Sequence, residues 1–267
     1  MPAPLITLTT DFGLDDGYAG AMKGVILGIL PWAQIVDISH AIAPQAILDA
    51  GYVLATAAPY FPRGTVHVVV VDPGVGTERR PLAVFTDRAV YIGPDNGVFS
   101  RVYGDENVQG IHQLANPAYR LPQISNTFHG RDLFAPAAAH IAAGIPPHSL
   151  GPEVDDPVRL AIPQPQRLAD GSLLGEVIYV DRFGNLITNV PVAWLEGRAE
   201  WRFEIGGVGI DGFHNTYGRV EVNQAVVLGG SEGLIEVAVR NNHAGAVLGL
   251  GTGARFSAQS TLGNSKE

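Results

Sequence analysis

Residues 66–74 read Val-His-Val-Val-Val-Val-Asp-Pro-Gly. A β-branched run of this length is typical of a strand covered on both faces, and the Asp-Pro-Gly after it predicts a turn. Apolar runs at residues 5–9 and 35–38 predict two more strands, and helical patterns at 18–30 and 47–58 lie between the three. This alternation predicts a parallel or mixed sheet with crossover helices. Asp15 or Asp16 is placed to cap the first helix.

The second half of the chain has a different pattern. Runs at 82–85 and 90–92 predict a hairpin, and an alanine-rich stretch at 134–143 predicts a helix. Residues 151–171 carry four prolines and are interpreted as a linker. Short β-type runs with glycine-rich turns follow, at 176–180, 186–190, 201–205, 220–222, 226–228 and 234–239. The predicted fold class is α/β, with an N-terminal α/β sheet domain (residues 1–160) and a smaller C-terminal all-β barrel domain (residues 172–267).

Composition narrows the function classes. The 267 residues carry a formal net charge of −9, which disfavours a nucleic-acid partner. The absence of cysteine excludes disulfides, thiolate nucleophiles and zinc–thiolate centres. We see neither a signal peptide nor an apolar run of about 20 residues, so we expect a cytoplasmic protein without a membrane partner.

Two carboxylates follow predicted strands. Asp11 comes after the first strand and Asp72 after the third, where ligands of open α/β sheets bind. Asp11 could hold a ribose diol, or it could only stabilise the turn that follows the strand. Asp72 precedes a glycine turn that could bring Arg79, or the competing Arg80, within reach of its carboxylate. The alternative is a tight turn beside a solvated arginine pair. No G-x-G-x-x-G motif is present, which argues against a dinucleotide.

Two further segments carry candidate chemistry. His129 opens the alanine-rich helix, where the helix dipole disfavours the imidazolium and leaves a ring able to accept a proton. Residues 180–189 read as a β-hairpin with Gly184-Asn185 at its turn. Its amide, carboxylate and aromatic groups could equally clasp a zwitterionic amino acid.

Five stretches together resemble one family. They are TTDFGLDDGYAGAMKG from Thr9, VDPGVGTERR from Val71, GPDNGVF from Gly93, TFHGRDLFAPAAA from Thr127 and YVDRFGNLITN from Tyr179. In this order they resemble the S-adenosyl-L-methionine hydrolases (adenosine-forming), which share a fold with fluorinase and chlorinase enzymes. The resemblance covers nearly the whole chain.

The resemblance implies an activity, an assembly and a set of site residues. S-adenosyl-L-methionine is the implied substrate, hydrolysed to adenosine and L-methionine by in-line attack of water or hydroxide on the ribose C5′. A homotrimer with active sites at subunit interfaces is implied, without metal or cofactor. The implied catalytic residues are Asp72, Arg79 and His129. The implied substrate-binding residues are Asp11, Asp16, Phe128, Asp181, Phe183, Asn185 and Ser231.

Departures from the halogenase branch favour hydrolysis. Asp72 stands where halogenases carry tyrosine, and Gly130 stands at their halide-contacting serine. Gln45 falls at a tryptophan and Glu232 at an arginine near the ligand carboxylate, which leaves the methionine-end contacts open. The alternatives are a chlorinase-like halogenase, a non-catalytic S-adenosylmethionine or adenosine-binding protein, and a metallohydrolase. Whether His129 is the base or Arg79 stabilises a hydroxide also stays open.

Overall fold

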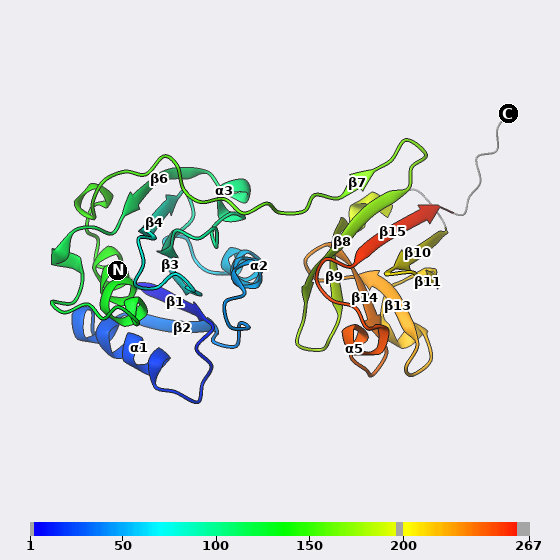
Figure 1. The fold of residues 1–267 in the computed structure, drawn as a ribbon, viewed down its shortest axis with the longest axis horizontal. Helices are drawn as coiled ribbons and strands as arrows, with labels where there is room; N and C mark the ends of the chain where they lie inside the picture. Colours follow the sequence, from blue (N-terminus) through cyan, green and yellow to red (C-terminus); the bar gives the residue numbers. More distant parts are fainter. Residues whose placement is uncertain (1–2, 196–199, 261–267) are drawn as a thin grey trace. The chain divides into compact units, whose positions relative to one another are not determined.

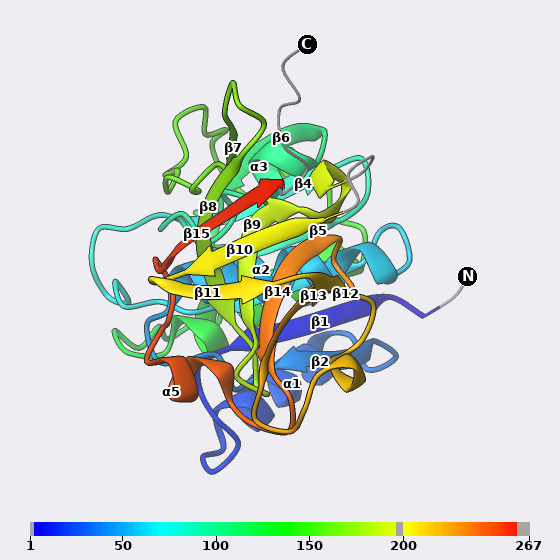
Figure 2. The same cartoon turned by 90° about the vertical axis from the view of Figure 1, so that its right-hand side faces the viewer.

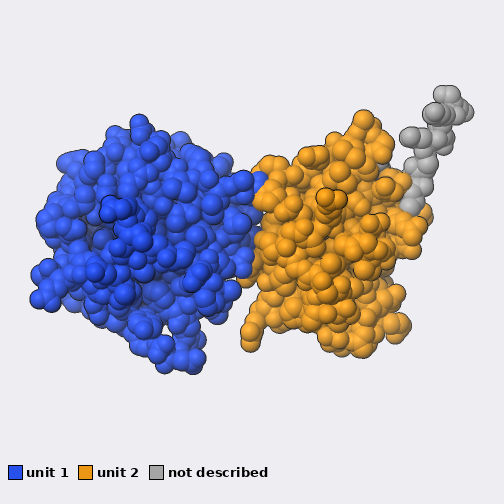
Figure 3. Space-filling model, in the orientation of Figure 1, with its two compact units in different colours: residues 1–162 blue, residues 163–267 orange. Residues whose placement is uncertain are grey.

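The computed structural model describes residues 3–195 and 200–260. The chain divides into two compact units, residues 1–162 and 163–267 (Figure 3). Each unit has its own sheet and its own apolar core. None of the helices in the described ranges has the length and apolar character that a membrane crossing requires.

Unit 1 is a six-stranded sheet in the order β2-β1-β3-β5-β4-β6 (Figure 1). β2, β1, β3 and β5 are parallel, whereas β4 runs antiparallel to β5 and β6. The strands are β1 (Leu5–Thr10), β2 (Gln34–Ser39), β3 (Val66–Val70), β4 (Pro81–Thr86), β5 (Val90–Pro94) and β6 (Val108–Gln113). The helices are α1 (Tyr18–Ile29), α2 (Ile47–Ala57), α3 (Val102–Asp105) and α4 (Ala135–Ala142).

Two apolar layers cover the sheet of unit 1. Side chains of α1 and α4, such as Met22 and Ala138, pack on one face with Leu8 and Val68. α2 packs on the opposite face, where Leu54 joins a second cluster of buried residues. All five residues of β3 are buried, as expected for a central strand covered on both sides.

The arrangement of parallel strands brings two predicted site segments to one edge. In the β1–β3 register Thr10 pairs with Val70, so the residues after these strands leave the sheet side by side. Because β4 is antiparallel to β5, Pro81 pairs with Pro94 and the start of β4 lies at the same edge. The segments bearing Asp11, Asp72 and Arg79 therefore share this carboxyl edge.

Unit 2 is a strand-rich, barrel-like sheet in the order β11-β10-β15-β8-β9-β14-β13-β12, with β7 beside β8 (Figure 2). Its core includes Trp201, Phe203 and Phe256. The strands are β7 (Gln166–Arg167), β8 (Leu173–Val180), β9 (Leu186–Pro191), β10 (Trp201–Ile205), β11 (Val208–Asp211), β12 (Phe213–His214), β13 (Ala225–Gly229), β14 (Leu234–Val239) and β15 (Arg255–Ser260). One short helix, α5, spans Ala244–Leu248.

Three local predictions differ from the structure. Gly17 is the N-cap residue of α1 and no side chain caps that end, so the capping prediction for Asp15 and Asp16 is wrong. Residues 220–222 lie outside the strands, because Val220 follows a short 3₁₀ turn and its carbonyl accepts a hydrogen bond from Arg240. The first part of the proline-containing stretch is no free linker, since residues 152–160 belong to unit 1 and hydrogen-bond to β6, Arg80 and Ser100.

Candidate functional site

Asp72, Arg79 and His129 meet at the carboxyl edge of the unit 1 sheet. Arg79 Nε lies 3.0 Å from each carboxylate oxygen of Asp72, and its Nη2 donates to Asp72 Oδ2. The same Nη2 lies 2.7 Å from Nδ1 of His129. The side chains of Arg79 and Asp72 are only 9% and 4% exposed. Asp72 and Arg79, seven residues apart, thus form one partly buried, hydrogen-bonded cluster with His129, which lies 50 residues beyond Arg79.

The loop after β3 folds back so that Arg79 reaches Asp72. Val75 donates its backbone N–H to the Asp72 carbonyl, and Thr77 donates to Gly74. Gly76 has φ +77, and a Cβ there would lie 2.3 Å from the Asn126 carbonyl oxygen. A side chain at this position would be excluded by both conformation and space. The glycine therefore brings the Arg79 loop against the segment that leads to His129.

Arg79 determines the protonation pattern of His129. A guanidinium has only donors, so the Nδ1 atom that faces it must be an acceptor. The neutral ring then carries its proton on Nε2. Burial, followed by the positive charge of Arg79, lowers the pKa of His129. In this arrangement the lone pair of His129 accepts from Arg79, whereas Nε2–H makes no hydrogen bond among residues 3–195 and 200–260 and can contact a ligand.

The buried Phe134 ring lies against Arg79, whereas the neighbouring Arg80 binds elsewhere. The Arg79 guanidinium carbon lies 5.2 Å from the centroid of the buried Phe134 ring, a cation–π arrangement that the sequence analysis missed. Arg80 binds elsewhere: its Nε donates to Asp95 at 2.8 Å and its Nη1 to Asp156 at 2.6 Å. Of the two competing arginines, Arg79 is the one beside Asp72.

Asp11 is held by the loop that follows β2. Its Oδ2 accepts the backbone N–H of Gln45 at 2.9 Å. Gln45 has φ +66, a left-handed conformation that non-glycine residues rarely adopt. A strained residue that fixes a carboxylate is typical of functional sites. Asp16 is exposed, and within the described part of the chain its side chain makes no hydrogen bond.

Phe128 belongs to an aromatic cluster beside His129. Its ring lies 5.8 Å from Phe12 and 5.2 Å from Tyr18, both edge-on, and the Arg131 guanidinium carbon lies 5.0 Å from its centroid. Gly130 leaves room for this cluster, since a Cβ there would lie 3.2–3.3 Å from Phe12, Met22 and Phe128. The cluster supplies an apolar wall next to the charged group.

In unit 2, Asp181 organises the β8–β9 hairpin. Its Oδ1 accepts the backbone N–H groups of Phe183 and Asn185, and its Oδ2 accepts Nδ2 of Asn185 at 2.9 Å. Gly184, at φ +87, lets the hairpin approach His243 and accepts the N–H of Gly245. The turn predicted from Gly184-Asn185 is present, with positive φ at the glycine.

A cavity of about 500 Å³ lies beside this hairpin. Its lining residues are Phe183, Asn185, Tyr217, Val239, Asn241 and Asn242. Two of them, Phe183 and Asn185, were predicted from the sequence, whereas Tyr217 and the Asn-Asn pair follow irregular segments and carry no motif. Ser231 lies apart from this lining, in the exposed turn between β13 and β14, where its hydroxyl donates to Glu232.

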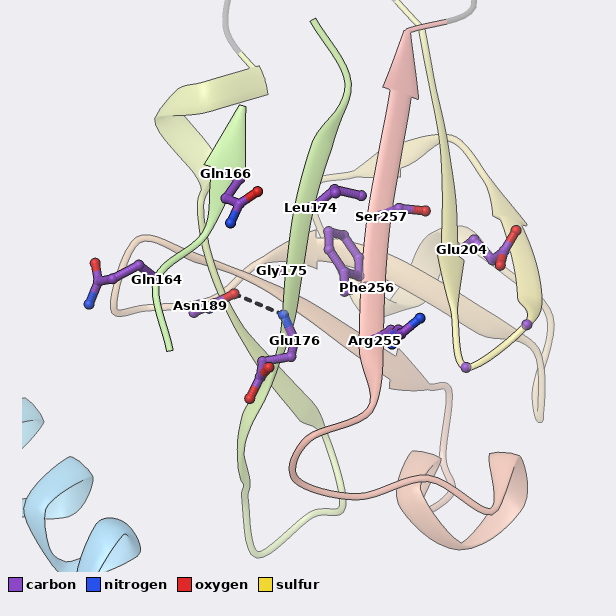
Figure 4. A pocket seen from close by; sticks show the side chains of 12 residues that line it. Gln164, Gln166, Leu174, Gly175, Glu176, Asn189, Glu204, Arg255, Phe256 and Ser257 are labelled. Atoms are coloured by element: carbon purple, nitrogen blue, oxygen red, sulfur yellow. Dashed lines mark hydrogen bonds between the residues drawn. The ribbon is translucent and has the colours of Figure 1, made fainter. Parts of the chain in front are cut away.

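Unit 2 has a second hollow, of about 610 Å³, over β8 and β15 (Figure 4). Gln164 and Gln166 stand on one side of it and Glu204 on the other. Asn189 also lines the hollow, and its Oδ1 accepts the backbone N–H of Glu176 at 2.9 Å. None of the predicted site residues lines this hollow. Within residues 3–195 and 200–260, no three histidine or acidic side chains are grouped closely enough to hold a metal ion.

Two family models match the chain, and they match its two units separately. The SAM hydroxide adenosyltransferase N-terminal domain matches residues 6–151, and the C-terminal domain of the same family matches residues 175–257. The chain belongs to the SAM hydroxide adenosyltransferase family. The resemblance predicted from the five motifs is therefore confirmed.

Relatives of this SAM hydroxide adenosyltransferase family member include named enzymes and solved structures. The (R)-S-adenosyl-L-methionine hydrolase of Thermus thermophilus is 43% identical over 91% of this chain and 95% of that protein. The enzyme of the same name from Salinispora tropica is 37% identical over 96% of this chain and 97% of that protein. A fluorinase from Actinoplanes sp. is 29% identical over 73% of this chain and 76% of that protein.

A solved structure from Thermotoga maritima, described as an uncharacterized conserved protein, has the same fold. It superimposes with a TM-score of 0.88 at 34% identity and covers 95% of this chain and 99% of that one. The family assignment thus rests on both sequence and structure.

Proposed function

We propose that this protein hydrolyses S-adenosyl-L-methionine to adenosine and L-methionine. Family membership and the relatives named as hydrolases support the reaction class. The observation that carries the proposal is the contact of Asp72, Arg79 and His129, which forms a compact group of polar donors and acceptors beside an apolar wall. Such a group suits a water molecule or hydroxide ion better than it suits a halide.

The chemistry needs a positioned oxygen nucleophile more than it needs an acid. Attack at C5′ forms the C5′–O bond while the C5′–S bond breaks, and its electron pair neutralises the sulfonium to the thioether of methionine. Arg79 Nη1 makes no hydrogen bond within the described residues, and His129 presents Nε2–H. We assign both as donors to a hydroxide formed from water, whose proton passes to solvent. Asp72 holds Arg79 in place for this role.

The remaining predicted residues bind the substrate in this proposal. Asp11 accepts hydrogen bonds from the ribose hydroxyls, and Asp16 and Phe128, which also belong to unit 1, contact the same substrate. Asp181, Phe183, Asn185 and Ser231 of unit 2 hold the methionine and adenine parts. The protein is a homotrimer in which unit 1 of one subunit and unit 2 of a neighbour share each substrate. The relatives' name specifies the R form, so we propose the R sulfonium epimer as the substrate.

The proposal includes a setting for the enzyme. It acts in the cytoplasm, without metal or organic cofactor, and binds neither membranes nor nucleic acid. The net charge of −9 supports the last point, because a polyanion would be repelled.

One chromatographic assay tests the function. The purified protein is incubated with each S-adenosylmethionine epimer, with and without chelator, in buffers with and without 1 M chloride. We expect adenosine and methionine in equal amounts from the R epimer under every condition. A 5′-halo-5′-deoxyadenosine product would identify a halogenase. Loss of turnover with chelator would identify a metallohydrolase. Binding without any product would identify a sensor.

A further inference from the structure

Glu236 is a buried carboxyl group that no ion pair compensates. It lies on β14 and is 5% exposed. None of the ion pairs among the described residues includes Glu236. A buried carboxylate without a cation is costly unless it receives hydrogen bonds. Its hydrogen-bond donor is the phenol of Tyr217, whose Oη lies 2.6 Å from Glu236 Oε1.

Tyr217 connects this buried group to the cavity beside the hairpin. The ring lines the cavity together with Phe183 and Asn185. Tyr217 begins a three-residue 3₁₀ turn in the irregular segment between β12 and β13, so no strand ladder fixes its backbone. Its phenol bond to Glu236 ties the ring to a central strand of the barrel.

The other aromatic side chain that lines this cavity, Phe183, has no such anchor. Phe183 is 77% exposed at the tip of the hairpin, and a phenylalanine ring has no group that could be anchored by a hydrogen bond. Gly230 makes space for the Glu236 carboxylate on its other side, since a Cβ there would lie 3.1 Å from Oε2. Burial, and the negative charge of Asp181, raise the pKa of Glu236, whereas the Tyr217 phenol lowers it.

We propose that Glu236 is a positioning residue of the substrate site: it holds the Tyr217 ring as the fixed wall of the cavity and so sets substrate affinity without touching the substrate. The identity of that substrate rests on the function proposed above. The geometry behind the proposal is a buried acceptor on a rigid strand, one phenol bond, and an otherwise weakly held ring that faces the cavity.

The test compares Tyr217→Phe, Glu236→Gln and the double variant. Kd for adenosine and for S-adenosylmethionine is measured by calorimetry, and KM and kcat are measured by chromatography. Tyr217→Phe keeps the ring and removes the anchor, so we expect Kd and KM to rise about five- to ten-fold with kcat within two-fold. Glu236→Gln keeps an acceptor oxygen for the Tyr217 phenol, so Kd and KM should rise only about two-fold. Kd and KM of the double variant should rise no further than those of Tyr217→Phe, because both substitutions break the same hydrogen bond.

The chain offers a matched control in unit 1. Tyr91 donates its phenol to Glu106 in the same way and lines no part of the proposed site. Tyr91→Phe should lower Tm and leave Kd and KM unchanged. The proposal is overturned if Tyr217→Phe changes only Tm, as Tyr91→Phe does, or if the effects of the two unit 2 changes are additive. Binding with the expected pattern but without turnover would contradict the proposed function and support this inference. Failure of the wild-type protein to bind either ligand would overturn both.

Discussion

Arg79 Nη2 lies 2.7 Å from Nδ1 of His129, and it also donates to Asp72. This relationship decides which role His129 can take in hydrolysis. The imidazole lone pair accepts from the guanidinium, so the ring faces a ligand with a proton and not with a base. We therefore propose that His129 and Arg79 hold a hydroxide, and that His129 does not itself remove the proton.

Replacement of His129 by Gln distinguishes a role as hydrogen-bond donor from a role as general base. Glutamine can present an N–H near the position of Nε2 but cannot take up a proton. We expect His129→Gln to keep within about ten-fold of the wild-type kcat, and His129→Ala to lose about 10²-fold or more. Steady-state kinetics on both variants checks this. Equal losses of 10³-fold or more in the two variants would show that His129 is the base.

The adjacent arginines form a matched pair for mutation. Arg79→Lys removes the guanidinium that contacts both Asp72 and His129, so kcat should fall about 10²–10³-fold. Arg80→Lys disrupts the bonds to Asp95 and Asp156, so it should lower Tm by a few degrees with kcat nearly unchanged. Thermal melts and kinetics on both variants give the comparison. The opposite pattern would transfer the catalytic role to Arg80.

Asp11 and Gln45 give a prediction about ribose recognition. Asp11→Asn should raise KM about ten-fold and reduce the preference for adenosine over 2′,3′-dideoxyadenosine in competition binding. Gln45→Gly keeps the N–H that binds Asp11 and relieves the positive φ, so it should raise the unfolding free energy by about 1 kcal/mol and leave that preference intact. An unchanged preference in Asp11→Asn would remove Asp11 from the ribose site.

His67 predicts acid sensitivity of folding. It is 1% exposed, stacks on Tyr91 and hydrogen-bonds Thr7, and burial, with Arg88 second, lowers its pKa from 6.5 to about 4. A folded-state pKa below the unfolded value means stability is present above pH 6.5 and is lost as pH falls toward 4. At about 1.4 kcal/mol per pKa unit the loss is about 3 kcal/mol. Urea melts at pH 7 and pH 4 should show it in the wild type and a smaller loss in His67→Phe. Equal losses would assign the acid sensitivity to other groups.

The sequence predicted the local elements of unit 1 better than the outer strands of unit 2. β3 was recognisable because four of its five residues are valine. Its position in the sheet set the edge at which Asp11 and Asp72 lie. β15 was missed because Arg255–Ser260 has only two apolar side chains, Phe256 and Ala258. A strand of that kind depends on its partners for identification.

The same distinction holds for the candidate site. Asp72 and His129 carried motif signals, but the bridge that Arg79 makes between them depends on a glycine at position 76 that lets two remote loops approach. Tyr217 had no such signal, because a buried carboxyl group holds it. Gln45 entered only as a departure from the halogenase pattern, since it contacts Asp11 through its backbone N–H. Long-range packing of this kind is not encoded in residue spacing.

The most direct test of the proposed function is the origin of the 5′-oxygen of the product. The purified protein is incubated with the R epimer of S-adenosylmethionine in water enriched in ¹⁸O, and the adenosine is analysed by mass spectrometry. We expect the 5′-hydroxyl oxygen of adenosine to carry ¹⁸O at the isotopic enrichment of the water, and L-methionine to be unlabelled. Adenosine without the label, or a product other than adenosine and methionine, would contradict it.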